Sequence, residues 1–310
     1  MKIGCGAPVS GAWATADNLA RFSARAEELG YDSLWTFQRL LVGADQELAP
    51  VYRSVLDPLI ALGFAAAHTS RIRLGVAVLN LPFVSPAHLA KQAGTLDLLS
   101  GGRFDLGLGL GWSAPEFAAT GASTARRGAR TEEYLRVLRT LWADEVSEFS
   151  GEFYQLPPSR MEPKPVQRPG PPVLLGGVVP AALARAGRLA DGWMSSSRTD
   201  LTGIAEQIAA VRGAAEQAGK DPAAVRIVCR GAVRADDRGR GLTAPDGTRQ
   251  RLSGSYAQIR EDAAWLGEQG VTELFYDLNW DPLIGHPEAD PRTAALRAEE
   301  VLHGLAPSGS

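Results

Sequence analysis

The run FDLGLGLG at residues 104–111 is where residue types and spacing first suggest chemistry. Large hydrophobic residues occupy every second position from Phe104, and three positions between them hold Gly107, Gly109 and Gly111. A period of two is typical of a β-strand, and glycines inside a strand often mark close approach by a ligand or another backbone. We interpret the bare face as the surface against which a planar ring lies.

Few other residues are placed for chemistry of their own. The sequence contains no GxSxG elbow, no P-loop and no paired carboxylates at useful spacing. The histidines are mostly on predicted helices or far from the expected strand ends, so no metal site is expected. They are His68, His88, His286 and His303. We expect such a protein to obtain its chemistry from an organic cofactor.

Composition and charge restrict the class of protein. The 310 residues are 45% hydrophobic and 22% charged, which allows a large core in one or two domains. A net charge of −3 gives no reason to expect nucleic acid or an anionic membrane as a partner. Cys5 and Cys229 are too few for a disulfide scaffold, and no apolar run reaches membrane length. Because the N-terminus reads as a strand rather than a signal peptide, we expect a cytoplasmic protein.

The rest of the chain alternates strand-like and helix-like segments that would position a cofactor. The strands are expected at residues 2–7, 33–37, 73–80, 103–109, 173–176, 192–196, 226–233 and 273–279. Hydrophobic periodicity predicts helices between them. One starts at a cap on Asp17 and ends at Gly30, and another, at 85–100, turns Leu89 and Leu99 inward.

Eight strand–helix pairs predict an α/β fold, a (β/α)8 TIM-type barrel, in a single domain at residues 1–305. One insertion at about 112–172 follows the fourth strand, with a helix break near Gly121 and a small hairpin at 146–155. A polar, glycine-rich loop at about 236–253 follows the seventh strand and is expected to be mobile. The tail at 306–310 is expected to be disordered. Because active sites in this fold lie at the C-terminal ends of the strands, we expect the site there.

Several segments resemble the luciferase-like flavin and deazaflavin oxidoreductase superfamily, and more narrowly its actinobacterial branch of F420-dependent oxidoreductases. They are AEELGYDSLW at 26–35, LDPLIALGFAAAHTSRIRLGVAVLNLPFVSPAHLAKQAGTLDLLSGGRFDLGLGLGW at 56–112, RGARTEEYLRVLRTLW at 127–142, PKPVQRPGPPVLLGG at 163–177 and RLADGWM at 188–194. Together they cover most of residues 2–194 in the expected order, whereas the last third matches only in its strand–helix rhythm. The resemblance implies a barrel with insertions that holds a redox ring at its C-terminal mouth.

The resemblance also implies where the cofactor would bind. In this family a bulge with a non-prolyl cis peptide supports the back of the ring, and Ala77-Val78 is the matching position. Gly176-Gly177 followed by Val178-Val179 is the candidate phosphate site, because the N–H groups at a helix N-terminus attract anions. A plain strand-to-helix turn is the alternative. Ser196 and Arg198, after the next strand, would add a hydroxyl group and a positive charge.

The end of strand two holds further candidates. Trp35 is assigned to the cofactor site, and Gln38 and Arg39 follow it as catalytic candidates. Related deazaflavin enzymes often carry an acid or a histidine here to exchange a proton, and this chain departs from that pattern. Gln38 is expected to hydrogen-bond a substrate carbonyl. Arg39 is expected to bind a carboxylate or an anionic cofactor tail, unless it is a surface arginine.

Three residues after strands three and four complete the predicted site. Trp112 is expected to wall the ring, and Asn80 to hydrogen-bond the ring edge or the substrate. Glu116 is the nearest carboxylate and a catalytic candidate, with a structural glutamate at a helix start as the alternative.

We therefore predict an F420-dependent oxidoreductase that transfers a hydride between coenzyme F420 and a small organic substrate, first by reducing an activated C=C or C=N bond. The alternative is an FMN-dependent monooxygenase of the same fold that uses oxygen and a partner flavin reductase. A third possibility is a cofactor-free relative that acts as a binding protein. Expected partners are a small-molecule or natural-product substrate, a second copy in a homodimer and a separate cofactor reductase. Neither nucleic acid nor a membrane is expected.

Overall fold

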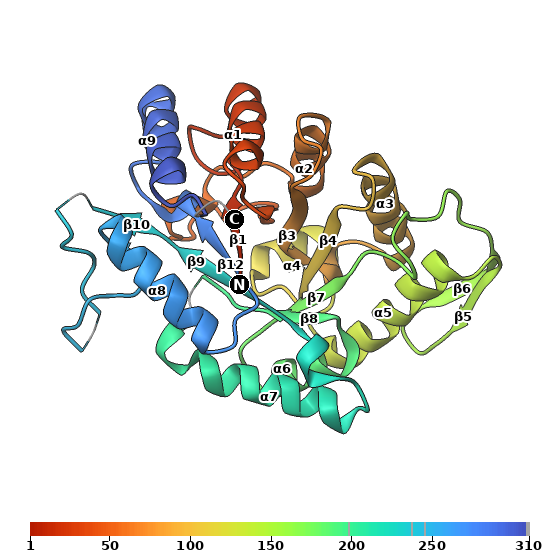
Figure 1. Ribbon diagram of the computed structural model, residues 1–310. Helices are drawn as coiled ribbons and strands as arrows, with labels where there is room; N and C mark the ends of the chain where they lie inside the picture. The colour runs from red at the N-terminus through yellow and green to blue at the C-terminus, as the bar shows by residue number, and fades with distance from the viewer. Residues whose placement is uncertain (198, 237, 245, 308–310) are drawn as a thin grey trace.

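The computed structural model describes residues 1–197, 199–236, 238–244 and 246–307, and in this part of the chain eight parallel strands close into a barrel. Helices surround the strands (Figure 1). Around the barrel the strands are β1 (Lys2–Gly6), β2 (Ser33–Thr36), β3 (Arg73–Asn80), β4 (Phe104–Gly109), β7 (Val173–Gly176), β8 (Gly192–Met194), β9 (Arg226–Ala232) and β12 (Glu273–Asp277). The predicted (β/α)8 barrel is confirmed.

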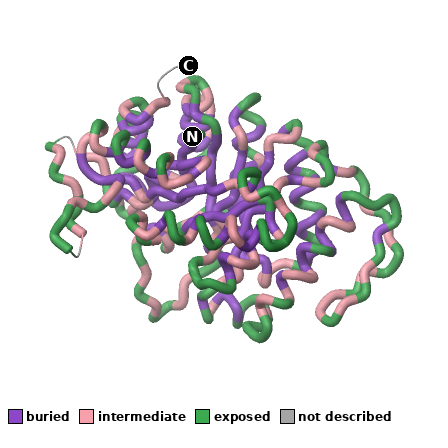
Figure 2. Tube along the Cα trace, turned by 60° about the horizontal axis from the view of Figure 1, so that its bottom comes forward, coloured by how far each residue is buried: buried purple, intermediate pink, exposed green. Residues whose placement is uncertain are grey.

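The helices outside the barrel bury one face and expose the other (Figure 2). They include α1 (Ala16–Glu28), α2 (Pro58–Ala67), α3 (Pro86–Leu99), α6 (Pro180–Leu189), α7 (Ile204–Gln217), α8 (Tyr256–Glu268) and α9 (Pro291–Gly304). The α1 cap is Thr15, so Asp17, predicted as the cap, lies in the first turn. On α3, Leu89 is buried as predicted, but Leu99 is 70% exposed because the buried face continues at Ser100. In the described residues, no helix combines the length and apolarity needed to span a bilayer.

The insertion after β4 contains two helices and a hairpin, as predicted. Helix α4 (Ala114–Thr120) ends at Gly121, whose φ of +66° is a left-handed conformation that glycine adopts without strain. Helix α5 (Arg127–Ala143) packs against α3, where the Trp142 Nε1 donates to the Ala90 carbonyl oxygen at 3.0 Å. Strands β5 (Ser147–Ser150) and β6 (Gln155–Ser159) pair antiparallel. Strand β6 therefore begins at residue 155, where the predicted hairpin ended, so the hairpin extends further along the chain than predicted.

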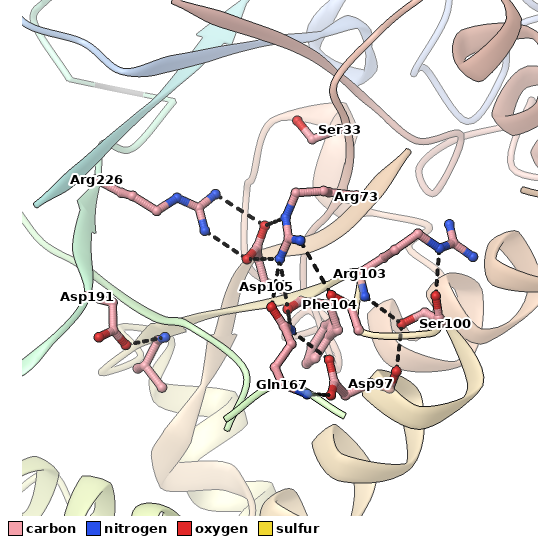
Figure 3. A network of polar contacts seen from close by, with 12 residues as sticks. Ser33, Arg73, Asp97, Ser100, Arg103, Phe104, Asp105, Gln167, Asp191 and Arg226 are labelled. Carbon is pink, nitrogen blue, oxygen red and sulfur yellow. Dashed lines mark hydrogen bonds and ion pairs between the residues drawn. The ribbon is translucent and has the colours of Figure 1, made fainter. Parts of the chain in front are cut away.

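An ionic network closes the N-terminal end of the barrel (Figure 3). Asp105 is fully buried and accepts hydrogen bonds from Arg73 Nε at 2.9 Å and Arg226 Nη1 at 2.8 Å. Arg226 also pairs with Glu273 at 3.0 Å. Burial alone would raise the pKa of Asp105, but the two arginines outweigh it and hold this pKa below its ordinary value. The network joins the starts of four strands and lies opposite the end where the site is expected.

An apolar layer fills the barrel interior next to this network. Trp35 is 1% exposed and stacks on Phe275 with ring centroids 5.3 Å apart. Its Nε1 donates to Ser33 Oγ at 2.8 Å, toward the ionic network. Gly75 leaves room for the ring, since a Cβ there would lie 2.3 Å from Trp35 Cε3. The Trp35 side chain therefore packs inside the barrel, in the apolar cluster against which Val78 packs, and its assignment to the cofactor site stays a prediction.

The loop at 236–253 is attached to the barrel at its C-terminal half. Strands β10 (Arg234–Ala235) and β11 (Ser253–Gly254) pair across it. Asp262 on α8 is 2% exposed and accepts from Arg249 Nη1 and from the Leu252 N–H, both at 2.7 Å. The mobility of this loop stays a prediction. Its residues 237 and 245, and residues 308–310 of the tail, lie outside the described residues.

Candidate active site at the barrel mouth

A bulge in β3 projects into the C-terminal end of the barrel. The register between β3 and β4 shifts between Val76 and Leu79. The Ala77–Val78 peptide bond is cis, which confirms the prediction made from the family resemblance. Of residues 74–80, Val78 alone is partly exposed. Its side chain therefore offers an apolar surface at the mouth.

Three hydrogen bonds, made with Arg230 and Gln38, hold this bulge. Arg230 Nη1 donates to the Ala77 carbonyl oxygen at 3.0 Å, and the Gln38 N–H donates to the Val78 carbonyl oxygen at 3.4 Å. The Asn80 N–H in turn donates to Gln38 Oε1 at 2.8 Å. That bond orients the Gln38 carboxamide, because it engages the oxygen and leaves the Nε2 donors without an acceptor among the described residues. Gln38 and Asn80 thus meet at the mouth, and their expected hydrogen bonds to a substrate or ring stay predictions.

The glycines of β4 make room for the bulge. A Cβ on Gly107 would lie 2.1 Å from the Val76 carbonyl oxygen, and one on Gly109 would lie 2.6 Å from Val78 Cγ2. Gly111 has a φ of +72°, which favours glycine. Protein atoms therefore fill the space beside Gly107 and Gly109, so a ring at the mouth would meet the bulge rather than the bare face of β4, and cofactor binding by these glycines stays a prediction. The surface left for a ligand is the exposed side of Val78.

Arg39 and Glu116 form a buried ion pair beside the mouth. Arg39 Nη1 lies 2.7 Å from Glu116 Oε2, and the two side chains are 4% and 1% exposed. The Leu40 N–H donates to Glu116 Oε1 at 2.8 Å. The guanidinium also lies 4.8 Å and 4.5 Å from the ring centroids of Tyr52 and Trp112. With both carboxylate oxygens engaged, the predicted catalytic role of this pair is not supported, and the pair instead attaches the loop after β2 to α4.

Strand β7 ends beside the bulge and leads into α6. A Cβ on Gly176 would lie 3.4 Å from Val78 Cγ1, so the two residues adjoin. Gly177 has a φ of +133°, which favours glycine. The helix has no side-chain cap, and Val178 and Val179 before it are exposed. An uncapped, exposed helix N-terminus suits an anionic group.

The residues after β8 that were predicted to join the phosphate site have less structural support. The Ser196 hydroxyl lies 3.2 Å from Thr199 Oγ1, and the Ser196 N–H donates to the same oxygen at 2.9 Å. This hydroxyl is therefore engaged locally. Arg198 lies outside the described residues. Anion binding by this segment stays a prediction.

Arg230 and Asp277 lie at the mouth, yet sequence reasoning gave them no role. Arg230 is 8% exposed, its Nε donates to Asp277 Oδ2 at 2.8 Å, and its Nη2 lies 2.6 Å from the same oxygen. The guanidinium lies 4.6 Å from the ring centroid of Phe37. The available signal was a second arginine inside the strand RIVCRGA, whose other residues after Arg226 are apolar, with an aspartate ending a strand that could neighbour it.

A cavity of about 880 Å³ opens beside Arg230. The segment after β8, strand β9 and the loop between β10 and β11 contribute to its wall. The wall includes Ser197, Thr199, Arg230, Thr248, Gln250 and Arg251. This volume is within the range of small-molecule binding sites.

The thiol nearest to Arg230 is not a nucleophile. Cys229 is fully buried, and burial raises its pKa to about 12 despite a hydrogen bond from the Ser195 hydroxyl. It therefore stays protonated at neutral pH.

The mouth therefore presents three groups to a ligand: the apolar side chain of Val78, called the Val78 shelf below, the oriented Gln38 amide and the Arg230 guanidinium. These groups can bind and orient a reactive group that another molecule supplies.

Comparison with known proteins agrees with this geometry. A model described as luciferase-like monooxygenase matches residues 3–243. An uncharacterised protein of Mycobacterium tuberculosis is 43% identical over 148 residues, which is 47% of this chain and 52% of the relative. An F420-dependent glucose-6-phosphate dehydrogenase of Kineococcus radiotolerans is 35% identical over 182 residues, 58% of this chain and 52% of the relative. An FMNH2-dependent dimethylsulfone monooxygenase of Pseudomonas putida is 35% identical over 152 residues, 48% of this chain and 41% of the relative. The matched segments thus span only about half the length of these curated relatives.

Solved structures resemble the whole chain. A monooxygenase from Streptomyces bottropensis has a TM-score of 0.78 at 23% identity, with 99% of this chain and 98% of that chain covered. A coenzyme F420-dependent tetrahydromethanopterin reductase from Methanopyrus kandleri has a TM-score of 0.76 at 16% identity, with the same coverage. At these identities the likeness shows the fold.

Proposed function

Because the chain belongs to the luciferase-like monooxygenase family, we propose that it is an oxidoreductase that binds coenzyme F420 at the barrel mouth. The reaction we propose first is reduction of an activated C=C or C=N bond in a small organic substrate. A bound reduced cofactor would supply the hydride for this reduction, and the substrate would also take up a proton. The identity to an F420-dependent dehydrogenase over 58% of this chain supports this cofactor.

The observation that carries the proposal is the bulge in β3. Val78 is the partly exposed apolar residue of that strand at the mouth, and a flat tricyclic ring would rest one face on it. The Gln38 amide donors suit the carbonyl oxygens on a deazaflavin edge. The turn at Gly176-Gly177, which adjoins Val78, suits the cofactor's phosphate. The residues present therefore fit the group.

A bound deazaflavin would supply the hydride, and the chain would supply orientation, hydrogen bonds and exclusion of water. The stacked Trp35 and Phe275 close the barrel beneath the bulge, so the ring would stay at the mouth. The Arg39–Glu116 pair fixes the loop that follows Gln38, which keeps its amide donors in place. We assign no proton transfer to Glu116, because both of its oxygens are engaged.

An FMN-dependent monooxygenase is the second candidate function. The FMNH2-dependent relative has the same 35% identity as the F420-dependent one, over a somewhat shorter segment. The Val78 shelf would suit an isoalloxazine ring equally well, and bound reduced FMN would supply the chemistry for oxygen activation.

Assembly and cofactor supply are part of the same proposal. We propose a homodimer, and a separate reductase that regenerates the cofactor. Ile60 and Phe64 on the outer face of α2 are 76% and 39% exposed, and exposed apolar residues on one helix support a contact between copies.

Titration of the purified protein with F420 and with FMN, followed by fluorescence, tests this function. We expect saturable F420 binding and weaker FMN binding. Gln38→Leu should weaken F420 binding about ten-fold, since it removes hydrogen bonds to a buried ring. Gln217→Leu, an exposed position at the end of α7, is the matched control and should bind like the wild type. Tight binding of FMN alone would establish the second candidate, and binding of neither cofactor would refute both.

A further inference from the structure

We infer that Arg230 is a substrate-binding residue whose guanidinium binds the carbonyl oxygen of an uncharged substrate in the adjacent cavity. The inference rests on the proposed function, because that function places the substrate beside the bulge, and Arg230 joins the bulge to the cavity. It adds the class of substrate and the residue that selects it.

The Arg230 guanidinium carries more donors than its protein partners engage. An arginine has five N–H groups in a rigid planar fork. One on Nε is used by Asp277 and one on Nη1 by the Ala77 carbonyl oxygen. The Nη2 lies 2.6 Å from Asp277 Oδ2 in an ion pair, which leaves one N–H on Nη1 and one on Nη2 without an acceptor among the described residues. The remaining donors belong to a side chain that is more than nine-tenths buried and contributes to the cavity wall.

Buried donors without acceptors favour a ligand that carries an acceptor oxygen. Leaving such N–H groups unpaired costs free energy, and a bound oxygen atom recovers it. Asp277 and the Ala77 carbonyl hold the guanidinium in place before a ligand binds. Binding therefore costs little side-chain conformational entropy. The same guanidinium bonds the bulge, so an oxygen bound to it lies next to the proposed ring site.

Charge decides between a neutral carbonyl and a carboxylate. Asp277 neutralises Arg230 directly. Elsewhere in the wall, Arg249 and Arg251 both pair with Asp262. Asp200 and Asp246 add two further negative charges to the described lining. The three arginines are therefore balanced by acidic groups, and an anion gains little attraction while it loses its hydration. A ketone or an aldehyde avoids that loss.

Three probes of the same shape test this inference. They are benzylideneacetone with a ketone, (3-methylbuta-1,3-dienyl)benzene with a methylene group in place of the ketone oxygen, and cinnamate with a carboxylate. Binding to the purified full-length protein is measured by ligand-observed NMR without added cofactor, so the result does not depend on the F420 titration. The wild type should bind the ketone more tightly than the other two probes. Binding of the ketone no tighter than the hydrocarbon would overturn the inference.

Variants separate recognition from a general structural effect. Arg230→Lys keeps a cation for Asp277 but loses the fork, and should weaken ketone binding about ten-fold while it leaves hydrocarbon binding unchanged. Gln250→Ala, in the same cavity wall, is the control and should keep the ketone preference. Equal weakening of both probes by Arg230→Lys, or no weakening, would contradict the assignment.

A second variant covers the case in which Arg230→Lys does not fold. Asp277→Asn keeps the guanidinium and removes its neutralising charge. It should shift the preference toward cinnamate by several-fold. An unchanged preference would show that the probes do not meet Arg230, and the inference would fail even if F420 binds as proposed.

Discussion

Gly107→Ala tests most simply whether the glycines of β4 accommodate the bulge of β3. The added Cβ would lie 2.1 Å from the Val76 carbonyl oxygen, whereas real Cβ atoms essentially never approach within 3.0 Å. A shift of about 0.9 Å is therefore needed, and it falls on backbone inside a closed barrel. We assign this overpacking about 3 kcal/mol, the upper part of its usual range. With about 2.1 cal/mol/K of unfolding entropy per residue over 310 residues, Tm should fall by about 4–5 °C.

Thermal unfolding followed by far-UV circular dichroism measures this effect. Gly63→Ala in α2 is the matched control, because nothing lies within 4 Å of its added Cβ. That change should stabilise the protein by roughly 0.5–1 kcal/mol through the helix propensity of alanine. If Gly107→Ala melts at or above the wild-type temperature, the bulge does not occupy the space beside Gly107, and a ligand site there becomes tenable again.

The two buried ion-pair systems give further predictions. Asp105→Asn should destabilise the protein by about 3–5 kcal/mol at pH 7, because two arginines lose their buried partner. The folded-state pKa of Asp105 is lowered, so its contribution is complete above the ordinary carboxyl value of about 3.9 and is lost as pH falls through the lower folded-state value. In urea denaturation, the free energy of unfolding of Asp105→Asn should therefore differ from that of the wild type more at pH 7 than in acid. The control Asp45→Asn, at an exposed position, should have the wild-type free energy of unfolding at both pH values. Glu116→Gln should lower Tm, since it leaves Arg39 buried without a carboxylate, and Arg39→Met combined with Glu116→Leu should restore part of the loss. Unchanged stability of Glu116→Gln with loss of turnover would instead identify a proton donor.

The order of elements was predictable from local pattern, because periodicity and turn residues act within a few positions of the chain. Gly121 ends a helix where its sequence context predicts, and the eight strands fall near their expected places. The cis peptide at Ala77–Val78 was predictable only from the family resemblance.

Side-chain direction inside the barrel was not predictable in the same way, because it depends on which strands become neighbours and in what register. The alternation of residue types along the strand showed that Gly107 lies on a face without side chains. It could not show that the Val76 carbonyl oxygen occupies the space beside that face. Trp35 likewise turns into the barrel, toward Ser33. Arg230 remained unassigned because its contact with Ala77 joins residues 153 positions apart.

We propose above all that a redox ring rests on Val78 at the barrel mouth. A crystal structure of the protein soaked with F420 tests this placement most directly. We expect the tricyclic ring in van der Waals contact with the Val78 side chain, with a ring carbonyl within hydrogen-bond distance of Gln38 Nε2. Electron density for the ring at any other place, with the mouth occupied only by solvent, would contradict the account.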